Sequence, residues 1–459
     1  MGNVARLMQE LGHQVSGSDK GVYPPMSTLL KDSGIRLFEG FDPARLESGD
    51  IDLVVVGNAV TRGNPEVEWL LNTREIPFVS LPALIQAELL KGRSPIVIAG
   101  THGKTTTSSM AAWLLKANGF NPGWLIGGVP GSLETGARVT DRDRPFVIEG
   151  DEYDSAFFDK RSKFIHYLPR ILVINQIEYD HADIFRDLED VKRSFRHLIR
   201  LVPEDGFLVI NGDDPVTAEL LPVDWTRVVR VGAGRSNDCQ IHHFSEDASG
   251  ARFSLYWQEQ PWANISWPIP GEFNARNAAM AAVASALAVY PDSPRALDLT
   301  PLERFKGVRR RQELRFQKDW LTVIEDFAHH PTAVSGLLES LRLRFPEHQI
   351  YLVFEPRSNT STTRVMEDAW LSTFLMADRL LLAPIYRENT IEPARRLDRA
   401  KLIQGMKEAG KAGFAADRYP QLLEELKAVS SESEVPLCLA FCSNGSFGGI
   451  LDQFLESIS

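Results

Sequence analysis

Residues 95–116 of this 459-residue chain read PIVIAGTHGKTTTSSMAAWLLK. Five apolar residues, Pro95–Ala99, predict a buried strand, and the stretch Ser108–Lys116 is compatible with a helix. The loop between them is Gly100-Thr101-His102-Gly103-Lys104-Thr105-Thr106-Thr107. Its glycines let backbone N–H groups turn toward an anion, and the N-terminus of the following helix adds a partial positive charge. The stretch therefore predicts a strand–loop–helix unit that binds the phosphates of a nucleotide.

The loop departs from the general G-x-x-x-x-G-K-[ST] pattern, because Ile98 occupies the first glycine position. Lys104 can still reach the β- and γ-phosphates of ATP, and the Thr105 hydroxyl can bind Mg²⁺. A chance glycine-rich turn is the alternative, but Lys-Thr after Gly at a helix start behind a strand argues against it. The predicted ATP-binding residues of the loop are Gly100, Thr101, His102, Gly103, Lys104, Thr105 and Thr106.

The composition is that of an ordinary globular chain, with 43% hydrophobic and 24% charged residues. The formal net charge of −11 argues against a nucleic-acid partner, because phosphate backbones demand a basic face. The sequence has neither an apolar run of the ~20 residues that span a bilayer nor a signal peptide. We therefore expect no membrane insertion and a cytoplasmic location. The three cysteines are not at zinc spacing and are expected to be buried or idle thiols.

Short β-branched runs alternate with longer amphipathic stretches, which predicts an α/β protein with parallel sheets and helices on both faces. The candidate strands are Asp52–Val56, Pro95–Ala99, Phe146–Glu149, Ile171–Asn175, Phe207–Asn211, Leu321–Glu325, Ile350–Phe354, Leu380–Ala383 and Leu437–Phe441. Length alone suggests about three domains. A linker at Lys91–Pro95 and a basic run at Lys306–Arg311 place these domains at residues 1–92, 93–311 and 312–459.

Two polar motifs follow strand candidates of the second block. The first, Glu149-Gly150-Asp151-Glu152-Tyr153-Asp154, puts a carboxylate where it can face a nucleotide, and a solvated acidic turn is its alternative. The second runs over residues 175–183 and contains His181. A lone histidine is usually structural, but the carboxylates of Asp180 and Asp183 could orient its ring toward a metal. From the residues alone, both interpretations of His181 stay open.

The variant Gly-Thr-x-Gly-Lys-Thr-Thr resembles the signature of the Mur ligase family, and the later motifs follow in that family's order. The resemblance implies an ATP-dependent ligase that joins a carboxylate to an amine. It implies a Rossmann-like N-terminal domain that binds a UDP-sugar, a central P-loop ATPase-like domain, and a Rossmann-like C-terminal domain that binds the incoming peptide. It also implies Mg²⁺ held by Thr105, Glu149 and His181, with Glu152 as the alternative carboxylate. The implied catalytic residues are Lys104, Glu149 and His181.

The same resemblance assigns three further residues to ATP. Asn274 would read the adenine edge, although it could also cap the Ala-rich helix that starts there. Arg311 would contact ATP at the domain junction, and Asp326 would hold the ribose; the alternatives are a solvated basic linker and a capped helix start. The tandem histidine His329-His330 by itself suggests a metal, but no third ligand is evident in the sequence. Neither histidine is therefore assigned to the metal.

The substrates are also inferred from resemblance. Gly17-Ser18-Asp19 resembles the uridine-binding turn of members that bind UDP-N-acetylmuramate, so Ser18 and Asp19 are expected to bind this nucleotide. Residues 22–30, 355–360 and 443–449 resemble one subgroup, as does the long stretch between the acidic and histidine motifs. That subgroup attaches L-alanyl-γ-D-glutamyl-meso-diaminopimelate to UDP-N-acetylmuramate in peptidoglycan recycling.

The incoming peptide is expected to contact Arg357, Ser358 and Asn359. The planar fork of an arginine suits a carboxylate, and a surface loop arginine is the alternative. Such a ligase would serve peptidoglycan synthesis, and through it cell shape, the cell cycle and cell division.

Other functions remain open at this point. They are a UDP-N-acetylmuramate–L-alanine ligase, an inactive ATP-binding relative, and a polyglutamate-adding folate ligase, against which the Gly-Ser-Asp turn argues. The family opens with a strand and a glycine-rich turn that cradles the substrate diphosphate, whereas this sequence starts at Met1-Gly2-Asn3, at or after that turn. The first helix, about Val4 to Gly12, is present. We therefore expect the first sheet to lack an inner strand.

Overall fold

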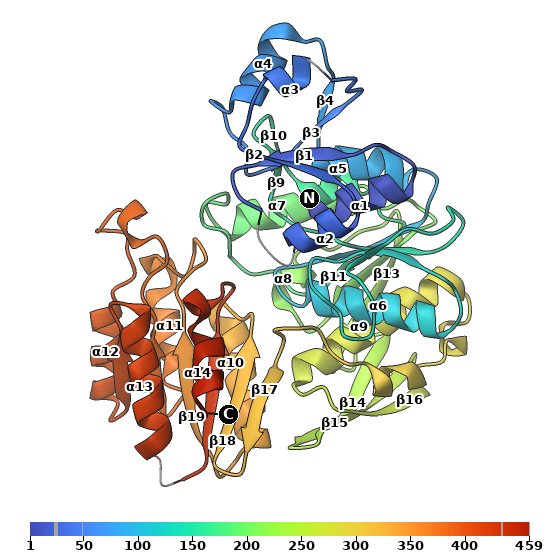
Figure 1. The fold of residues 1–459 in the computed structure, drawn as a ribbon. Coiled ribbons are helices and arrows are strands. Elements are labelled where there is room, and N and C mark those ends of the chain that lie inside the picture. Colours follow the sequence, from blue (N-terminus) through green and yellow to red (C-terminus); the bar gives the residue numbers. More distant parts are fainter. Residues whose placement is uncertain (23–25, 48, 433–434, 459) are drawn as a thin grey trace.

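The computed structural model describes residues 1–22, 26–47, 49–432 and 435–458. Figure 1 shows an N-terminal part at the top, a central part below it and a C-terminal part at the left. Each part combines parallel strands with helices, so the predicted three-domain α/β class is confirmed. Among the described residues, no helix is both long and apolar enough to cross a membrane.

The N-terminal part contains two pairs of parallel strands. β1 (Ser16–Asp19) pairs with β2 (Arg36–Glu39), and β3 (Val54–Val56) pairs with β4 (Phe78–Ser80). The helices of this part are α1 (Gly2–Glu10), α2 (Met26–Asp32), α3 (Ala44–Glu47) and α4 (Pro65–Thr73). Two short helical segments, α5 (Leu81–Leu84) and the π-helix η1 (Ile85–Leu90), then lead into the central part.

The central sheet has ten strands in the order β16-β15-β14-β13-β12-β11-β5-β8-β6-β7. β5 (Pro95–Ala99), β8 (Phe146–Glu149) and β12 (Phe207–Asn211) begin and end where the sequence predicts, and β11 (Ile171–Ile174) ends one residue earlier. β5 lies between β8 and β11 and is parallel to both. The carboxyl ends of these three strands therefore meet at one edge of the sheet, which is where ligands bind in open α/β sheets.

The other strands of this sheet are β6 (Gly123–Leu125), β7 (Ala137–Arg138), β13 (Arg227–Gly232), β14 (Cys239–Asp247), β15 (Gly250–Trp257) and β16 (Gln260–Trp267). None of these six was among the predicted strands, and the last three pair antiparallel to one another. In β15, the buried side chains of Phe253, Leu255 and Trp257 alternate with more exposed ones. This alternation, and not a β-branched run, is the signal for these strands in the sequence.

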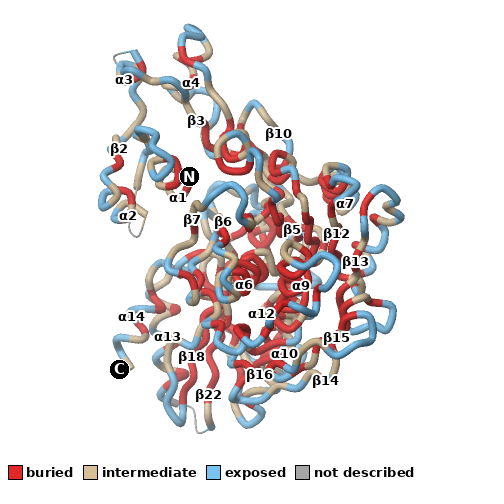
Figure 2. Tube along the Cα trace, turned by 90° about the vertical axis from the view of Figure 1, so that its right-hand side faces the viewer, coloured by how far each residue is buried: buried red, intermediate tan, exposed pale blue. Residues whose placement is uncertain are grey.

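Helices cover both faces of the central sheet. On one face, α6 (Lys104–Ala117) and α9 (Glu272–Val289) share a core with Ile96 and Ile98 of β5. On the other face, α5, η1 and α7 (Leu188–Ile199) share a core with Val97 and Ala99. Figure 2 shows that α6, α9 and β5 are buried along most of their length. Burial of apolar surface stabilises the folded state by about 25 cal/mol per Å². The packing of α6 against the sheet therefore holds the N-terminus of this helix at the sheet edge.

The C-terminal sheet has the order β17-β18-β22-β19-β20-β21 and is parallel apart from β17. Its strands are β17 (Glu313–Lys318), β18 (Leu321–Asp326), β19 (Gln349–Phe354), β20 (Arg379–Leu382), β21 (Ala412–Ala415) and β22 (Leu437–Cys442). Its helices are α10 (Pro331–Arg344), α11 (Glu367–Phe374), α12 (Arg399–Glu408), α13 (Tyr419–Glu432) and α14 (Ile450–Ile458). The three cysteines are free and buried, in β14 and β22.

Candidate active site

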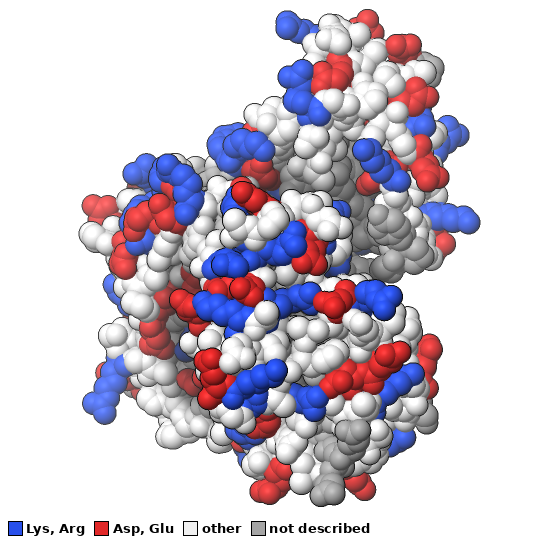
Figure 3. All heavy atoms as spheres, turned by 90° about the vertical axis from the view of Figure 1, so that its left-hand side faces the viewer, with Lys and Arg blue, Asp and Glu red and all other residues white. Residues whose placement is uncertain are grey.

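One cavity of about 1690 Å³ reaches all three parts of the chain. Its lining includes the α1 start, the phosphate loop, the end of β8 and the residues that follow β11. At the junction with the C-terminal part it includes residues 308–313, Arg315 and residues 325–330. Figure 3 faces the side of the molecule on which the C-terminal part lies and shows basic and acidic side chains intermingled over that face. The cavity itself is lined by groups of both signs, among them Lys104, Arg311, Glu149 and Asp326.

The phosphate loop forms the floor of the cavity, and its second glycine is sterically required. Gly103 has φ +79° and caps α6, which begins at Lys104. A Cβ atom at Gly103 would lie 2.4 Å from Asn277 Oδ1 and 2.6 Å from Asn175 Nδ2. Only glycine combines this backbone conformation with so close an approach. The N-terminus of α6 is thus left open to an anion, as the loop sequence predicts.

The Lys104 ammonium is turned back onto its own loop. Its Nζ donates hydrogen bonds to the carbonyl oxygens of Gly100 at 2.6 Å and Thr101 at 3.2 Å, and lies 3.1 Å from Glu152 Oε1. Burial lowers the pKa of Lys104, but the carboxylates of Glu152, Asp151 and Glu149 more than compensate, and the pKa is raised. The amine therefore stays cationic beside the loop.

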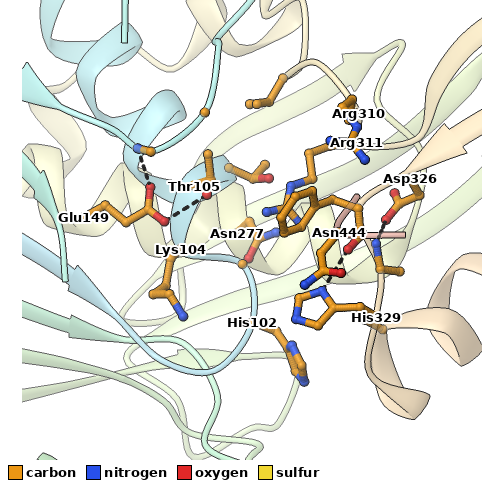
Figure 4. Close-up of a pocket in the computed structure, with 18 of the residues that line it drawn as sticks. His102, Lys104, Thr105, Glu149, Asn277, Arg310, Arg311, Asp326, His329 and Asn444 are labelled. Carbon is orange, nitrogen blue, oxygen red and sulfur yellow. Dashed lines mark hydrogen bonds between the residues drawn. The ribbon is translucent and has the colours of Figure 1, made fainter. Parts of the chain in front are cut away.

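The structure brings Thr105 and Glu149 together. The Thr105 hydroxyl donates to Glu149 Oε1 at 3.0 Å, and Glu149 Oε2 accepts the Gly127 N–H at 2.9 Å (Figure 4). A hydroxyl and a carboxylate oxygen are the donors that Mg²⁺ prefers. These side chains thus fit the ion that the resemblance implies.

His181 lines the same cavity but contacts a different carboxylate. Its Nε2 lies 3.0 Å from Glu152 Oε1, and its ring packs against Tyr153 with centroids 4.1 Å apart. Burial lowers the pKa of His181, but the hydrogen bond to Glu152 and the charges of Glu152 and Asp180 together outweigh it, and the pKa is raised. Glu152 is only 2% exposed and joins Lys104 to His181. Among the described residues, no hydrogen bond joins His181 to Thr105 or Glu149.

Asn274 lies at the start of α9 and lines the cavity. Its Nδ2 donates to the Pro270 carbonyl at 2.6 Å, and its Oδ1 accepts from Asn277 Nδ2 at 3.2 Å. The side chain therefore stabilises the first turn of the helix. A second lone pair on Oδ1 leaves room for one more hydrogen bond, so the capping and nucleotide interpretations are compatible.

Arg311 at the domain junction and Asp326 of the C-terminal part line the same cavity as the phosphate loop (Figure 4). The Arg311 guanidinium lies over the Phe327 ring, 4.7 Å from its centroid. Both Asp326 oxygens accept backbone N–H groups, from Gln312 at 2.7 Å and Ala328 at 2.7 Å. Burial raises the pKa of Asp326, which the Arg311 charge opposes. The neighbouring Arg310 instead bonds Glu325 Oε1 at 2.7 Å and so ties the junction to β18.

The predicted substrate residues lie away from the described lining of this cavity. Ser18 donates to Glu66 Oε2 at 2.6 Å in the N-terminal part. Asp19 Oδ1 accepts the Gly21 N–H at 3.4 Å. The neighbouring chain toward α2 includes residues 23–25, which are outside the described residues.

The predicted peptide contacts follow β19. The Arg357 guanidinium stacks on the Tyr386 ring, 3.8 Å from its centroid, with the buried Glu355 carboxylate 3.8 Å away. Ser358 donates to Ser361 Oγ at 2.9 Å, and Asn359 is exposed. Arg357 is therefore a preformed cation on an aromatic support and not a free surface arginine.

The cavity residues to which the sequence assigned no role include His329 and Asn444. His329 lies in the cavity with Nδ1 2.9 Å from the Phe327 carbonyl, and burial lowers its pKa to about 4. Asn444, in the loop after β22, also faces the cavity, and its Oδ1 is buried without a hydrogen-bond partner among the described residues (Figure 4). In the sequence, the tandem histidine draws attention to His329, whereas no motif draws attention to Asn444.

Comparison with protein-family models gives three matches that follow one another along the chain. Residues 1–92 match the Mur ligase family, catalytic domain; residues 98–285 match the Mur ligase middle domain; and residues 309–440 match the Mur ligase, glutamate ligase domain.

Individual relatives match over nearly the full length. The UDP-N-acetylmuramate–L-alanyl-γ-D-glutamyl-meso-2,6-diaminoheptandioate ligase of Escherichia coli K12 is 39% identical, over 100% of this chain and 96% of the relative. A UDP-N-acetylmuramate–L-alanine ligase of Acidithiobacillus ferrooxidans is 33% identical, over 99% and 94%. The crystal structure of a murein peptide ligase from Psychrobacter arcticus superposes with a TM-score of 0.71 at 31% identity, over 100% and 96% of the two chains.

Proposed function

The chain belongs to the Mur ligase family of amide-forming ligases, and from that premise we propose that it joins L-alanyl-γ-D-glutamyl-meso-diaminopimelate to UDP-N-acetylmuramate at the expense of ATP. The observation that carries the proposal is that the phosphate loop, the Thr105–Glu149 pair and Arg311 line one and the same cavity. The choice of peptide is supported by the higher identity to the relative named for this tripeptide, 39% against 33% for the alanine ligase.

The first step must convert an unreactive carboxylate into an electrophile. The lactyl carboxylate oxygen attacks the γ-phosphorus of ATP, the bond from that phosphorus to the β–γ bridging oxygen breaks, and an acyl phosphate and ADP result. Lys104 and the N-terminus of α6 offset the negative charge that spreads over the transferring group. Because Lys104 is cationic and held by the loop, its position is organised before the nucleotide arrives.

Thr105, Glu149 and His181 are the residues proposed to hold Mg²⁺. When bound there, the ion would neutralise charge on the phosphates. The Thr105–Glu149 hydrogen bond keeps these oxygens adjacent at the mouth of the loop. The Glu152 carboxylate has a separate task, because it holds both Lys104 and His181.

In the second step the free amine of the peptide attacks the carbonyl carbon, and phosphate leaves from the tetrahedral intermediate as the amine loses a proton. Arg311 and Asp326 are proposed to position ATP across the domain junction, and Asn274 is proposed to contact the edge of the adenine ring. Arg357 is proposed to bind a peptide carboxylate. The C-terminal part must close over the central part for these groups to meet one substrate complex.

The proposed substrates are small soluble molecules. UDP-N-acetylmuramate is proposed to bind at Ser18 and Asp19. We assign it to the cytoplasm and to peptidoglycan synthesis through recycling of wall peptides, with cell shape, the cell cycle and division as downstream processes. ATP is consumed as a substrate, and Mg²⁺ is its proposed companion.

The proposal is tested by measuring release of ADP and phosphate with UDP-N-acetylmuramate and either the tripeptide or L-alanine. We expect turnover with the tripeptide and little with L-alanine; the reverse would favour the alanine ligase. ATP binding without turnover on either would favour an inactive relative.

A variant links this turnover to the phosphate loop. Lys104→Ala should lower turnover by about 10²–10³-fold. Lys116→Ala, later in the same helix and paired with Glu134 at 3.5 Å, should not. Equal rates for Lys104→Ala and the unaltered chain would remove the loop from the mechanism.

A further inference from the structure

A second cluster of metal-ligand side chains lies at the domain junction, separate in its residues from the Thr105–Glu149 pair. It contains His102 of the phosphate loop, Glu178 after β11 and His330 before α10. The ligand atoms of these three residues all lie within 4.8 Å of one another. Glu178 Oε2 is 2.7 Å from His102 Nε2 and 3.3 Å from His330 Nδ1. The structure thus supplies the partners that the tandem histidine lacks in the sequence.

The hydrogen bonds of His330 fix which ring nitrogen carries the proton. Its Nε2 lies 3.3 Å from the Tyr179 carbonyl oxygen, which can only accept, so Nε2 is the protonated nitrogen. Nδ1 is the unprotonated nitrogen: it accepts the Thr332 backbone N–H at 3.4 Å and lies 3.3 Å from Glu178 Oε2. A metal ion bound here would take this lone pair in place of that long capping hydrogen bond.

Outer contacts hold two of the three ligands in a metal-binding pose. Metal-bound histidines usually donate the other ring N–H to a carbonyl or carboxylate, as His330 does to Tyr179. The Thr332 hydroxyl donates to Glu178 Oε1 at 2.8 Å and leaves Oε2 directed at both histidines. Bound carboxylates are commonly fixed in this way.

We propose that His102, Glu178 and His330 form a site for a divalent transition-metal ion of the zinc class, with a fourth position open. Zn²⁺ binds imidazole nitrogen and carboxylate oxygen at 2.0–2.2 Å, so neighbouring ligand atoms of a tetrahedral site lie ~3.3 Å apart. The separation of Glu178 Oε2 and His330 Nδ1 already has this value. The shorter contact to His102 is a hydrogen bond that lengthens when an ion replaces its proton. Two nitrogen ligands disfavour Mg²⁺, which prefers oxygen.

The site joins two parts of the chain, and this gives metal binding a consequence. His102 and Glu178 belong to the central part, and His330 belongs to the C-terminal part. An ion that needs all three ligands binds only when these parts are together, and it shifts the population toward that arrangement. Occupancy should therefore slow any step that requires the parts to separate.

The test uses the full-length protein stripped with a chelator, in buffer with excess Mg²⁺, titrated with Zn²⁺ in a calorimeter and with Co²⁺ in a spectrophotometer. We expect one strong Zn²⁺ site per chain and the visible absorption bands of tetrahedral Co²⁺. His330→Asn keeps a helix-capping oxygen and Glu178→Gln keeps the carboxylate shape, yet each removes a ligand. Both variants should weaken Zn²⁺ binding at least tenfold and lose the Co²⁺ bands.

The matched control is His243→Asn, a substitution in an exposed histidine at φ +54° that lies outside the cluster. It should bind Zn²⁺ like the unaltered chain. Far-ultraviolet circular dichroism checks that each variant is folded, and if His330→Asn is not, Glu178→Gln carries the test. The proposal is overturned if neither ion binds, or if a folded His330→Asn or Glu178→Gln binds Zn²⁺ as tightly as the control. No readout depends on ligase turnover, so the outcome is independent of the proposed function.

Discussion

The Thr105 hydroxyl donates a 3.0 Å hydrogen bond to Glu149 Oε1, which joins the first turn of α6 to the end of β8. The contact connects two motifs 44 residues apart in the sequence, the phosphate loop and the acidic turn. It exists because β5 and β8 are adjacent parallel strands whose carboxyl ends share one edge of the sheet. Two oxygen donors therefore meet where a nucleotide's metal would lie.

This pairing predicts which carboxylate governs the response to Mg²⁺. Glu149→Gln keeps an acceptor for the Thr105 hydroxyl but removes the negative charge, so the Mg²⁺ concentration for half-maximal turnover should rise at least tenfold. Glu152→Gln should instead lower the maximal rate, because Glu152 holds Lys104 and His181. Mg²⁺ titrations of both variants check this. An unchanged Mg²⁺ requirement in Glu149→Gln together with a raised one in Glu152→Gln would reverse the assignment.

The phosphate loop should be intolerant of a single methyl group at Gly103. In Gly103→Ala, the new Cβ collides with the side chains of Asn277 and Asn175 in a left-handed backbone conformation, which should cost about 1–3 kcal/mol and weaken ATP binding. Gly119→Ala is the matched control, because Gly119 also has positive φ, at +84°, but meets nothing within 4 Å. Urea unfolding and ATP titration should separate the two. Equal losses in both would show that only backbone strain matters.

The peptide assignment predicts a selective effect at Arg357. Arg357→Lys keeps the charge but loses the planar fork and its stacking on Tyr386, so the KM for the tripeptide should rise about tenfold with the KM for ATP unchanged. Arg387→Lys is the control, since Arg387 lies over the same ring at 5.1 Å but is exposed. A rise in the KM for ATP, or no change for the peptide, would count against this role.

The half-buried His329 predicts loss of stability in acid. Its pKa is about 4 in the folded protein and near 6.5 when solvated, chiefly because burial disfavours the charged ring. Above pH 6.5 both states are neutral; as pH falls toward 4, only the unfolded state takes up the proton, and stability falls by on the order of 1–3 kcal/mol. His329→Gln should flatten this slope between pH 7.5 and 5 in urea unfolding, whereas His243→Asn should not. Parallel slopes in all three proteins would refute the assignment.

Much of the architecture follows from local patterns in the sequence. The runs at β5, β8 and β12 are apolar and bounded by polar motifs, so their limits could be predicted without tertiary information. The Ala-rich α9 is likewise recognisable because its small side chains suit close packing against α6. The antiparallel strands β14–β16 were missed because their signal is alternation along one buried face, not a continuous apolar run.

The candidate site was less accessible to such reasoning. The loop and Glu149 stand at strand ends, where the chemistry of a sheet edge is predictable. The link from Lys104 to His181 through Glu152, and the approach of His330 to His102, depend on how separate elements pack. Likewise the basic run 309–311 does not reveal that Arg310 bonds Glu325 while Arg311 enters the cavity.

The most direct test of the central claim follows oxygen from the substrate carboxylate. UDP-N-acetylmuramate labelled with ¹⁸O in its lactyl carboxylate is turned over with ATP and the tripeptide, and the released phosphate is analysed by mass spectrometry. If the loop binds ATP so that this carboxyl group is phosphorylated, each phosphate carries one ¹⁸O atom. Amide product accompanied by unlabelled phosphate would contradict the acyl-phosphate route, and failure to form product or ADP would contradict the ligase assignment itself.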